Sequence, residues 1–227
     1  MKAKAVIEAA GVSLRYPDGT LALNNIDLQI QQGELAFVTG PSGSGKTSLL
    51  KLLLGMEYPT SGYVEVLGQD MNLTQASAIR KLRRRIGPVF QEFKLLKGRT
   101  VLENVILGQR FLDVPQTQMK ENSLDALKKV GLEHKALSLV ENLSWGEHQR
   151  VAIARAVARK PLLILADEPT GNLDKENALK ILDLLASFKD NKTSVLITTH
   201  ATHLMKSEYT NMIIKIDQGA LEWERIG

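Results

Sequence analysis

Hydrophobic positions along this chain follow two patterns, short apolar or alternating runs and longer runs with helical spacing. The continuous apolar runs 35–39, 162–166 and 194–199 predict buried strands, of the kind found in a parallel sheet covered on both faces. Shorter or alternating runs predict further strands over 5–7, 12–14, 25–30, 63–67 and 86–90, and a hairpin over 212–223. Most of the predicted strands therefore lie before residue 91 or after residue 160.

Helical spacing of apolar residues predicts helices between these strands. The segments are 48–54, ended by Gly55, the basic segment 78–85, 123–130, ended by Gly131, and 144–159, followed by Pro161. Apolar pairs at 101–102 and 105–106 add to the helical pattern, and 109–119, which contains Pro115, is interpreted as a connection. We expect this helical insert to form a subdomain.

The composition narrows the class of protein without identifying it. The 227 residues have 44% hydrophobic and 24% charged content, which is ordinary for a globular protein. The absence of cysteine excludes disulfides and thiol chemistry, and the four histidines lack metal-ligand spacing. A net charge of +4 suits an anionic surface or a nucleotide without requiring nucleic acid. With no apolar run of membrane-spanning length and no secretory signal, we expect a cytosolic protein that reaches a membrane only through a partner.

A glycine-rich segment lies between the predicted strand 35–39 and the helix after it. Residues 40–47 fit the pattern G-x-x-x-x-G-K-[ST], in which backbone N–H groups and a helix N-terminus surround an anion. Lys46 is expected to reach the β- and γ-phosphates, and the Thr47 hydroxyl to ligate Mg²⁺. The predicted nucleotide-binding residues here are Gly40, Ser42, Gly43, Ser44, Gly45, Lys46, Thr47 and Ser48. The sequence therefore predicts a nucleoside triphosphate site.

Two acids and a histidine follow the other buried strands. Asp167 and Glu168 come directly after the run 162–166, and His200 follows the run 194–199. Parallel strands bring their carboxyl ends to one edge of the sheet, where ligands bind in open α/β folds. Adjacent acids at such an edge require a cation or a proton-transfer role. We expect Asp167 to hold Mg²⁺ through water, Glu168 to activate the attacking water and His200 to sense the γ-phosphate.

Three further features leave alternatives open when they are read alone. Ser144 and Glu147 have the spacing of a capping box, so they predict a structural cap or a second anion site at a helix N-terminus. Tyr16 is either a packing residue or a ring that stacks on adenine. Gln91, at the end of the predicted strand 86–90, carries little information by itself.

Taken together and in order, these motifs resemble those of the ABC-type ATPase subunits over the whole chain. The matching segments are the phosphate loop, Gln91 as the Q-loop glutamine, 143–150 as the signature, 162–168 as Walker B, Asn172–Asp174 as the D-loop and His200 as the switch histidine. The resemblance also places Tyr16 where the family has its adenine-stacking aromatic residue. It implies that two subunits close head to tail, with each ATP between one phosphate loop and the other subunit's signature.

The resemblance implies an α/β fold with a P-loop NTPase (RecA-like) core and its parallel sheet, an N-terminal antiparallel β subdomain and a helical signature subdomain. The chain would form one domain over 1–227. In it, 1–90 and 160–227 make the β subdomain and the core, and 91–159 make the helical subdomain.

ATP and Mg²⁺ are the implied cofactors. The resemblance assigns catalysis to Glu168, His200 and Lys46, and Mg²⁺ binding to Thr47, Gln91 and, through water, Asp167. Beyond the phosphate loop, it assigns ATP contacts to Tyr16, Gln91, Ser144, Gly146, Glu147 and Asp174, the last crossing the interface of an ATP-dependent homodimer.

Within the family, the chain is similar to the FtsE-type ATPases of cell division. Segments 82–87, 89–96 and 99–105 carry this likeness, whereas 166–174 is shared with lipoprotein-releasing and macrolide-exporter ATPases. The likeness implies an FtsX-like integral membrane partner, regulation of peptidoglycan hydrolysis, and a peripheral location at the cytoplasmic face of the inner membrane. The ATPase of a lipoprotein-release or macrolide-type exporter complex is the alternative.

Other classes of nucleotide-binding protein fit less well. Residues 191–194 lack the aspartate of the guanine-binding Asn-Lys-x-Asp motif, which argues against a GTPase, and a kinase has no use for the signature. The run Arg83–Arg85 favours a nucleic-acid-bound ABC ATPase only superficially, because the chain has no room for a second cassette or a long coiled coil. We therefore expect no direct nucleic-acid partner.

The chain departs from the family pattern at three positions. Trp145 stands at the first of two glycines usual after the signature serine, His148 stands where glutamine is usual, and Ala201 replaces a common aspartate. If position 145 requires a positive φ, tryptophan there costs about 1–3 kcal/mol of strain. Trp145 is thus predicted to give weaker ATP-dependent dimerisation or slower turnover than glycine.

Overall fold

The structure is a computed structural model that describes residues 4–72, 75–171, 173–202 and 208–226. Its strands are β1 (Ala5–Arg15), β2 (Leu21–Gln31), β3 (Leu35–Thr39), β4 (Ser61–Val66), β5 (Gln69–Asp70), β6 (Ile86–Val89), β7 (Leu163–Ala166), β8 (Ser194–Thr199), β9 (Met212–Asp217) and β10 (Ala220–Arg225). Its α-helices are α1 (Lys46–Leu53), α2 (Ala76–Arg84), α3 (Val101–Leu107), α4 (Gln116–Lys129), α5 (Trp145–Val157) and α6 (Lys175–Ala186).

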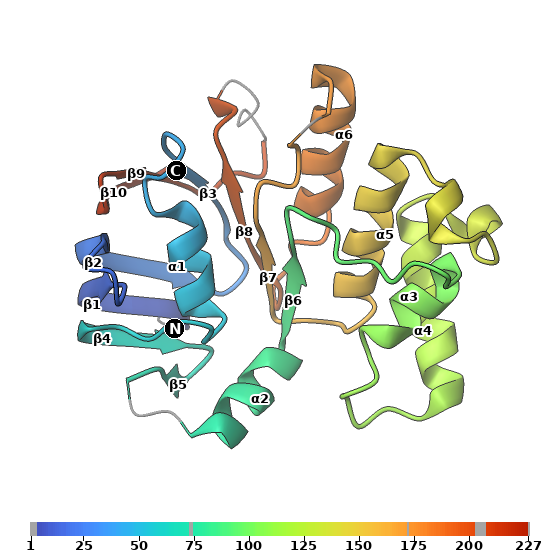
Figure 1. The fold of residues 1–227 in the computed structure, drawn as a ribbon, viewed down its shortest axis with the longest axis horizontal. Helices are drawn as coiled ribbons and strands as arrows, with labels where there is room; N and C mark the ends of the chain where they lie inside the picture. The colour runs from blue at the N-terminus through green and yellow to red at the C-terminus, as the bar shows by residue number, and fades with distance from the viewer. Residues whose placement is uncertain (1–3, 73–74, 172, 203–207, 227) are drawn as a thin grey trace.

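A six-stranded sheet with the order β10-β9-β3-β8-β7-β6 forms the centre of the molecule (Figure 1). The pairs β3–β8, β3–β9, β7–β8 and β6–β7 are parallel, and only β10 runs antiparallel, as the predicted hairpin with β9. Every residue of β3, β7 and β8 is buried, as their continuous apolar runs predict. The predicted α/β class with a parallel core sheet is confirmed.

A second, antiparallel sheet with the order β2-β1-β4-β5 lies beside the first, with α1 between them (Figure 1). The predicted strands 5–7 and 12–14 are one strand, β1, which an irregularity interrupts where the register shifts between Ala9 and Val12. Gly11 lies inside this irregularity with a φ of 59°. One hydrophobic core joins both sheets to α1 through residues such as Ile7, Leu52 and Val38.

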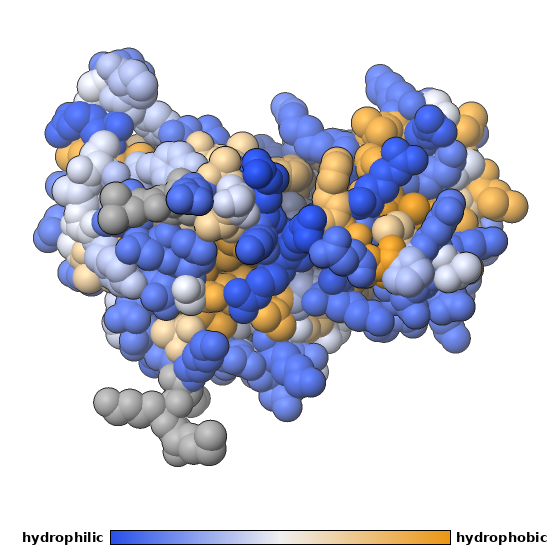
Figure 2. Space-filling view, turned by 90° about the horizontal axis from the view of Figure 1, so that it is seen from below, coloured by the Kyte–Doolittle hydropathy of each residue, from blue (hydrophilic) through white to orange (hydrophobic). Residues whose placement is uncertain are grey.

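The helices between β6 and β7 cover the other end of the molecule (Figure 1). A second core joins α3, α4, α5 and α6 to the opposite face of the six-stranded sheet. Figure 2 shows hydrophobic surface at this helical end, where the exposed apolar side chains include Phe111, Leu124 and Leu137. Among the described residues, no helix has both the length and the apolar character needed to span a membrane.

Two helices differ from the sequence prediction. Helix α4 begins at Gln116, inside the segment predicted as a connection, because Pro115 precedes the helix rather than interrupting it. Helix α6 was not predicted, although Asp174 caps it and Ala178, Ile181, Leu182 and Leu185 form its buried face. Both helices have apolar residues at helical spacing. The prediction missed the start of α4 because of Pro115, and it missed α6, which directly follows the motif 166–174.

Candidate active site

The carboxyl ends of three parallel strands bring the predicted polar residues to one edge of the sheet. The phosphate loop follows β3, the two acids follow β7 and His200 follows β8. The register pairs Thr39 with Thr199 and Ala166 with Ile197, so the three strands end near the same level. The sheet itself therefore positions the site.

Two glycines of the phosphate loop lie where a side chain would collide with the backbone. Gly40 has a φ of 149°, and a Cβ there would lie 2.0 Å from the Ile216 carbonyl oxygen. Gly45 has a φ of 116°, and its Cβ would lie 2.5 Å from the Ala22 carbonyl oxygen. The loop can curl against β9 and β2 only because both positions lack a side chain.

Lys46 is the buried cation of the site. Only 5% of the residue is exposed, and its ammonium group donates to the carbonyl oxygens of Gly40 at 2.8 Å and Pro41 at 2.9 Å. The same group lies 3.4 Å from a carboxylate oxygen of Glu168. The hydroxyl of Ser44 is also buried and has no hydrogen-bond partner among the described residues, so the loop presents a cation and a free polar atom together.

Asp167 is held by two hydroxyl groups from other elements. Thr198 of β8 donates to its Oδ1 at 2.8 Å, and Thr47 of α1 donates to the same oxygen at 3.3 Å. Thr198 also accepts a hydrogen bond from the Glu168 backbone N–H at 2.9 Å. Sequence reasoning missed Thr198, although a hydroxyl residue near the end of a fully buried strand is a signal that could have indicated it.

Glu168 lies between the two other candidate catalytic residues. One carboxylate oxygen faces Lys46, and the other accepts a hydrogen bond from His200 Nδ1 at 2.7 Å. Glu168 has a φ of 41°, in the left-handed region that costs a non-glycine residue about 1–3 kcal/mol and is frequent at functional sites. The hydrogen bond from its N–H to Thr198 supports this turn.

Tyr16 lies beside the phosphate-loop helix. Its hydroxyl shares a hydrogen bond of 3.1 Å with the Ser48 hydroxyl, and the Lys51 ammonium lies 5.9 Å from its ring centre. The ring is half-buried and packs partly on the first core, so it makes both the structural contact and an approach to the predicted nucleotide site.

The structure does not bring every predicted site residue into this cluster. Among the described residues, no hydrogen bond or ion pair joins Gln91, Ser144, Gly146, Glu147 or Asp174 to Lys46, Thr47, Asp167, Glu168 or His200. Gln91 follows β6, next to β7, with an exposed side chain. Asp174 caps α6, and hydrogen bonds from Asn177 lower its pKa. Asn172, predicted as part of the D-loop, lies outside the described residues.

The start of α5 has both halves of the predicted capping box. The Glu147 carboxylate accepts from the Ser144 N–H at 2.8 Å, and the Ser144 hydroxyl accepts from the Glu147 N–H at 3.4 Å. Lys135 adds an ion pair of 2.6 Å, and these hydrogen bonds lower the pKa of Glu147 to about 2. Trp145 is the first residue of the helix and has no left-handed φ, so its backbone carries no such strain in this conformation.

Replacing Glu147 by glutamine is expected to lower the free energy of unfolding by about 1 kcal/mol at pH 7, because the cap and the ion pair both weaken. The folded-state pKa lies below the ordinary value of 4.5, so this stabilisation is present above pH 4.5 and is lost as the pH falls through about 2. Urea unfolding of wild type and variant at several pH values measures it. Glu224→Gln, on the exposed strand β10, is the matched control and should show no such difference.

Comparison with known proteins agrees with this geometry. The model of the ABC transporter family matches residues 23–171. A solved structure, described as the dimeric post-hydrolysis state of the ATP-binding cassette MJ0796 bound to ADP and phosphate, superimposes with a TM-score of 0.85 at 33% identity, over 97% of this chain and 99% of that one. The chain therefore belongs to the ABC transporter family, as one of its ATP-binding and ATP-hydrolysing subunits.

Similar curated proteins narrow this class. Cell division ATP-binding protein FtsE of Mycobacterium tuberculosis is 42% identical over 88% of this chain and 86% of its own length. FtsE of Escherichia coli is 41% identical over 91% of this chain and 93% of its own length. Methionine import ATP-binding protein MetN 2 of Enterococcus faecalis is 40% identical over 88% of this chain but only 58% of its own length. Near full-length likeness to FtsE proteins of several bacteria supports an FtsE-type ATPase of an ABC complex.

Proposed function

We propose that Lys46, Glu168 and His200 are the catalytic residues of this ATPase. The contact of Glu168 with both Lys46 and His200 is the observation that carries the assignment. Lys46 would bind the β- and γ-phosphates together with the N–H groups of the loop, and His200 would contact the γ-phosphate. Glu168 would act as the general base, orienting the attacking water and accepting its proton.

The oxygen atoms near Thr47 suit a magnesium ion. Thr47 and Asp167 approach each other within 3.3 Å, and hydroxyl and carboxylate oxygens are ligands that Mg²⁺ prefers. We assign Mg²⁺ to Thr47, Gln91 and, through water, Asp167. When bound, the ion would neutralise charge that develops on the transferred phosphoryl group.

The predicted site residues that lie outside the cluster are assigned to the ATP bound by a second subunit. In a head-to-tail homodimer, Ser144, Gly146 and Glu147 at the positive end of α5 would face the ATP of the other subunit, and Asp174 would cross the interface. The solved structure of MJ0796 described above is a dimer, which supports this arrangement. Tyr16 would stack on the adenine within its own subunit.

The membrane partner we propose is an FtsX-like integral subunit. ATP-driven closure of the dimer would then pull on this partner at the cytoplasmic face of the inner membrane, where the pair regulates peptidoglycan hydrolysis. Residues 91–159 would move as the helical subdomain against 1–90 and 160–227. Support comes from the identity with FtsE proteins over most of the chain.

Affinity capture of the tagged Glu168→Gln chain from detergent-solubilised native membranes with Mg-ATP tests the partner. We expect recovery of an FtsX-like protein in amounts that fall when ATP is replaced by ADP. Tagged Lys46→Met protein, which is expected to bind ATP weakly, is the control: any partner it recovers is captured independently of ATP. Recovery instead of a lipoprotein-release, drug-export or methionine-import permease would contradict the cell-division assignment and leave the nucleotide site in place.

A further inference from the structure

The ring of Phe93 lies between two other aromatic side chains at the start of α5. Trp145 meets it edge to face, with ring centres 4.5 Å apart and planes at 72°. His148 stacks on it, with ring centres 5.4 Å apart and planes at 15°. All three side chains are half-buried. We refer to Phe93, Trp145 and His148 as the aromatic clamp.

The backbone at Phe93 also forms hydrogen bonds with a second residue of α5. Arg155 of α5 donates to the carbonyl oxygens of Phe93 and Lys94, each at 2.5 Å. The segment after β6 is therefore attached to α5 through a side chain near the start of the helix and through its backbone farther along. Gln91 lies only two residues before Phe93 in the chain, next to this attachment.

Two of the three clamp residues are the departures that set this signature apart from the family pattern. Trp145 replaces a glycine and His148 replaces a glutamine, and both side chains contact Phe93. Both departures therefore contact one residue, Phe93. In this structure Gln91 is exposed, and no hydrogen bond joins it to Thr47, Asp167 or any other described residue.

We propose that the aromatic clamp is a restraint on Gln91, and that Trp145 and His148 are positioning residues that slow basal turnover through Phe93. This inference rests on the proposed role of Gln91 at the magnesium site. It differs from a simple steric role for Trp145, in which the indole obstructs the ATP of the facing subunit. In our account, ATP binding must loosen the clamp before Gln91 can reach the ion.

Basal ATP hydrolysis by Phe93→Leu and Trp145→Gly proteins tests the restraint. An edge-to-face aromatic pair contributes an interaction equivalent to a factor of about 2 to 10, so each variant is expected to raise the basal rate by that factor. The double variant should gain no more than the larger single effect, because both changes open one contact. Trp145→Phe keeps an aromatic edge against Phe93 and should stay near the wild-type rate.

A rise for Trp145→Gly with no change for Phe93→Leu would overturn the clamp in favour of steric obstruction. Unchanged rates in both variants, with unfolding temperatures like that of the wild type, would also overturn it. If neither the wild type nor any variant hydrolyses ATP, the proposed function is contradicted instead. The Trp145 fluorescence measurement then tests the clamp.

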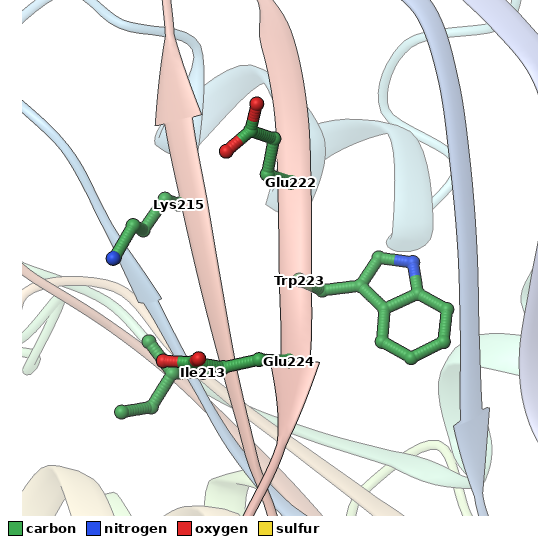
Figure 3. A pocket seen from close by; sticks show the side chains of 5 residues that line it. All are labelled: Ile213, Lys215, Glu222, Trp223 and Glu224. Atoms are coloured by element: carbon green, nitrogen blue, oxygen red, sulfur yellow. The ribbon is translucent and has the colours of Figure 1, made fainter.

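Fluorescence of Trp145 reports on the clamp without relying on hydrolysis. The chain has two tryptophans, and the other, Trp223, lies on β10 with its ring directed away from β9 and toward β2 (Figure 3). The Trp223 indole donates to the Asp27 carbonyl of β2 at 3.1 Å, and the side chain is exposed. Trp223→Phe therefore leaves Trp145 as the only tryptophan of the chain.

In the Trp223→Phe protein, Mg-ATP is expected to change the intensity and the emission maximum of Trp145. Adding Phe93→Leu should shift the nucleotide-free emission toward that of the ATP-bound state and remove most of the ATP response. Binding of ATP, measured separately by equilibrium dialysis, with no change in Trp145 emission would overturn the clamp.

Discussion

Replacing Glu168 by glutamine is expected to reduce ATP hydrolysis by about 100-fold or more, while ATP affinity changes by no more than about threefold. A positioned general base contributes a factor of about 10² to 10⁴, and glutamine cannot accept the proton of the attacking water. The amide has nearly the same shape, so the contacts to Lys46 and His200 keep a polar partner. Phosphate release and equilibrium binding of ATP measure the two quantities.

Glu176→Gln provides the matched control. Glu176 lies exposed in the first turn of α6, and its carboxylate pairs with Lys180 at 2.6 Å and with none of the candidate catalytic residues, so hydrolysis should be unchanged. Near-normal turnover by the Glu168→Gln protein would refute the assignment of Glu168 and direct attention to His200 as the base.

Replacing Lys46 by methionine is expected to weaken ATP binding by about 100-fold. Hydrogen bonds to charged groups contribute about 1.5–3 kcal/mol each, and the ammonium group is assigned to both the β- and the γ-phosphate. Methionine keeps most of the buried stem and so preserves the packing of this 5%-exposed residue. Isothermal titration with ATP measures the loss.

Lys180→Met removes an exposed lysine that pairs with Glu176 and should leave ATP affinity unchanged. A Lys46→Met protein that binds ATP as tightly as the wild type would mean that the loop backbone alone holds the phosphates. Thermal unfolding of both variants separates loss of the cation from loss of the fold.

The centre of the fold and most of the candidate site were predictable because buried parallel strands have continuous apolar sequences. The continuous apolar runs at β3, β7 and β8 predicted three strands, and the polar residues after each run then had to share one edge. The phosphate loop carried its own pattern of glycine, lysine and threonine. Lys46, Glu168 and His200 are accordingly found together.

Other features depend on contacts between distant parts of the chain. Thr198 supports both acids, but its position near the end of a buried strand indicates only a candidate, because the acids it contacts follow a different strand, β7. Phe93 meets Trp145 and His148 only because α5 packs against the segment after β6. The two departures in the signature lie about one helical turn apart, which was the only local signal of a shared contact.

The roles proposed for Ser144, Gly146 and Asp174 involve contacts with a second subunit, which local sequence patterns do not encode. In this structure Ser144 and Asp174 both act as helix caps, which is sufficient reason for their presence. Ser144 caps α5, whereas Asp174 caps α6.

The most direct test of the account is therefore the mass of the Glu168→Gln protein in solution with Mg-ATP. Light scattering coupled to size exclusion should give twice the 25.1 kDa of one chain with ATP and a single chain with ADP. A Ser144→Ala change in the same background should reduce the dimer, since it removes a proposed contact to the ATP of the facing subunit. The same mass with ATP, with ADP and without nucleotide, while ATP is shown to be bound, would contradict hydrolysis between two head-to-tail subunits.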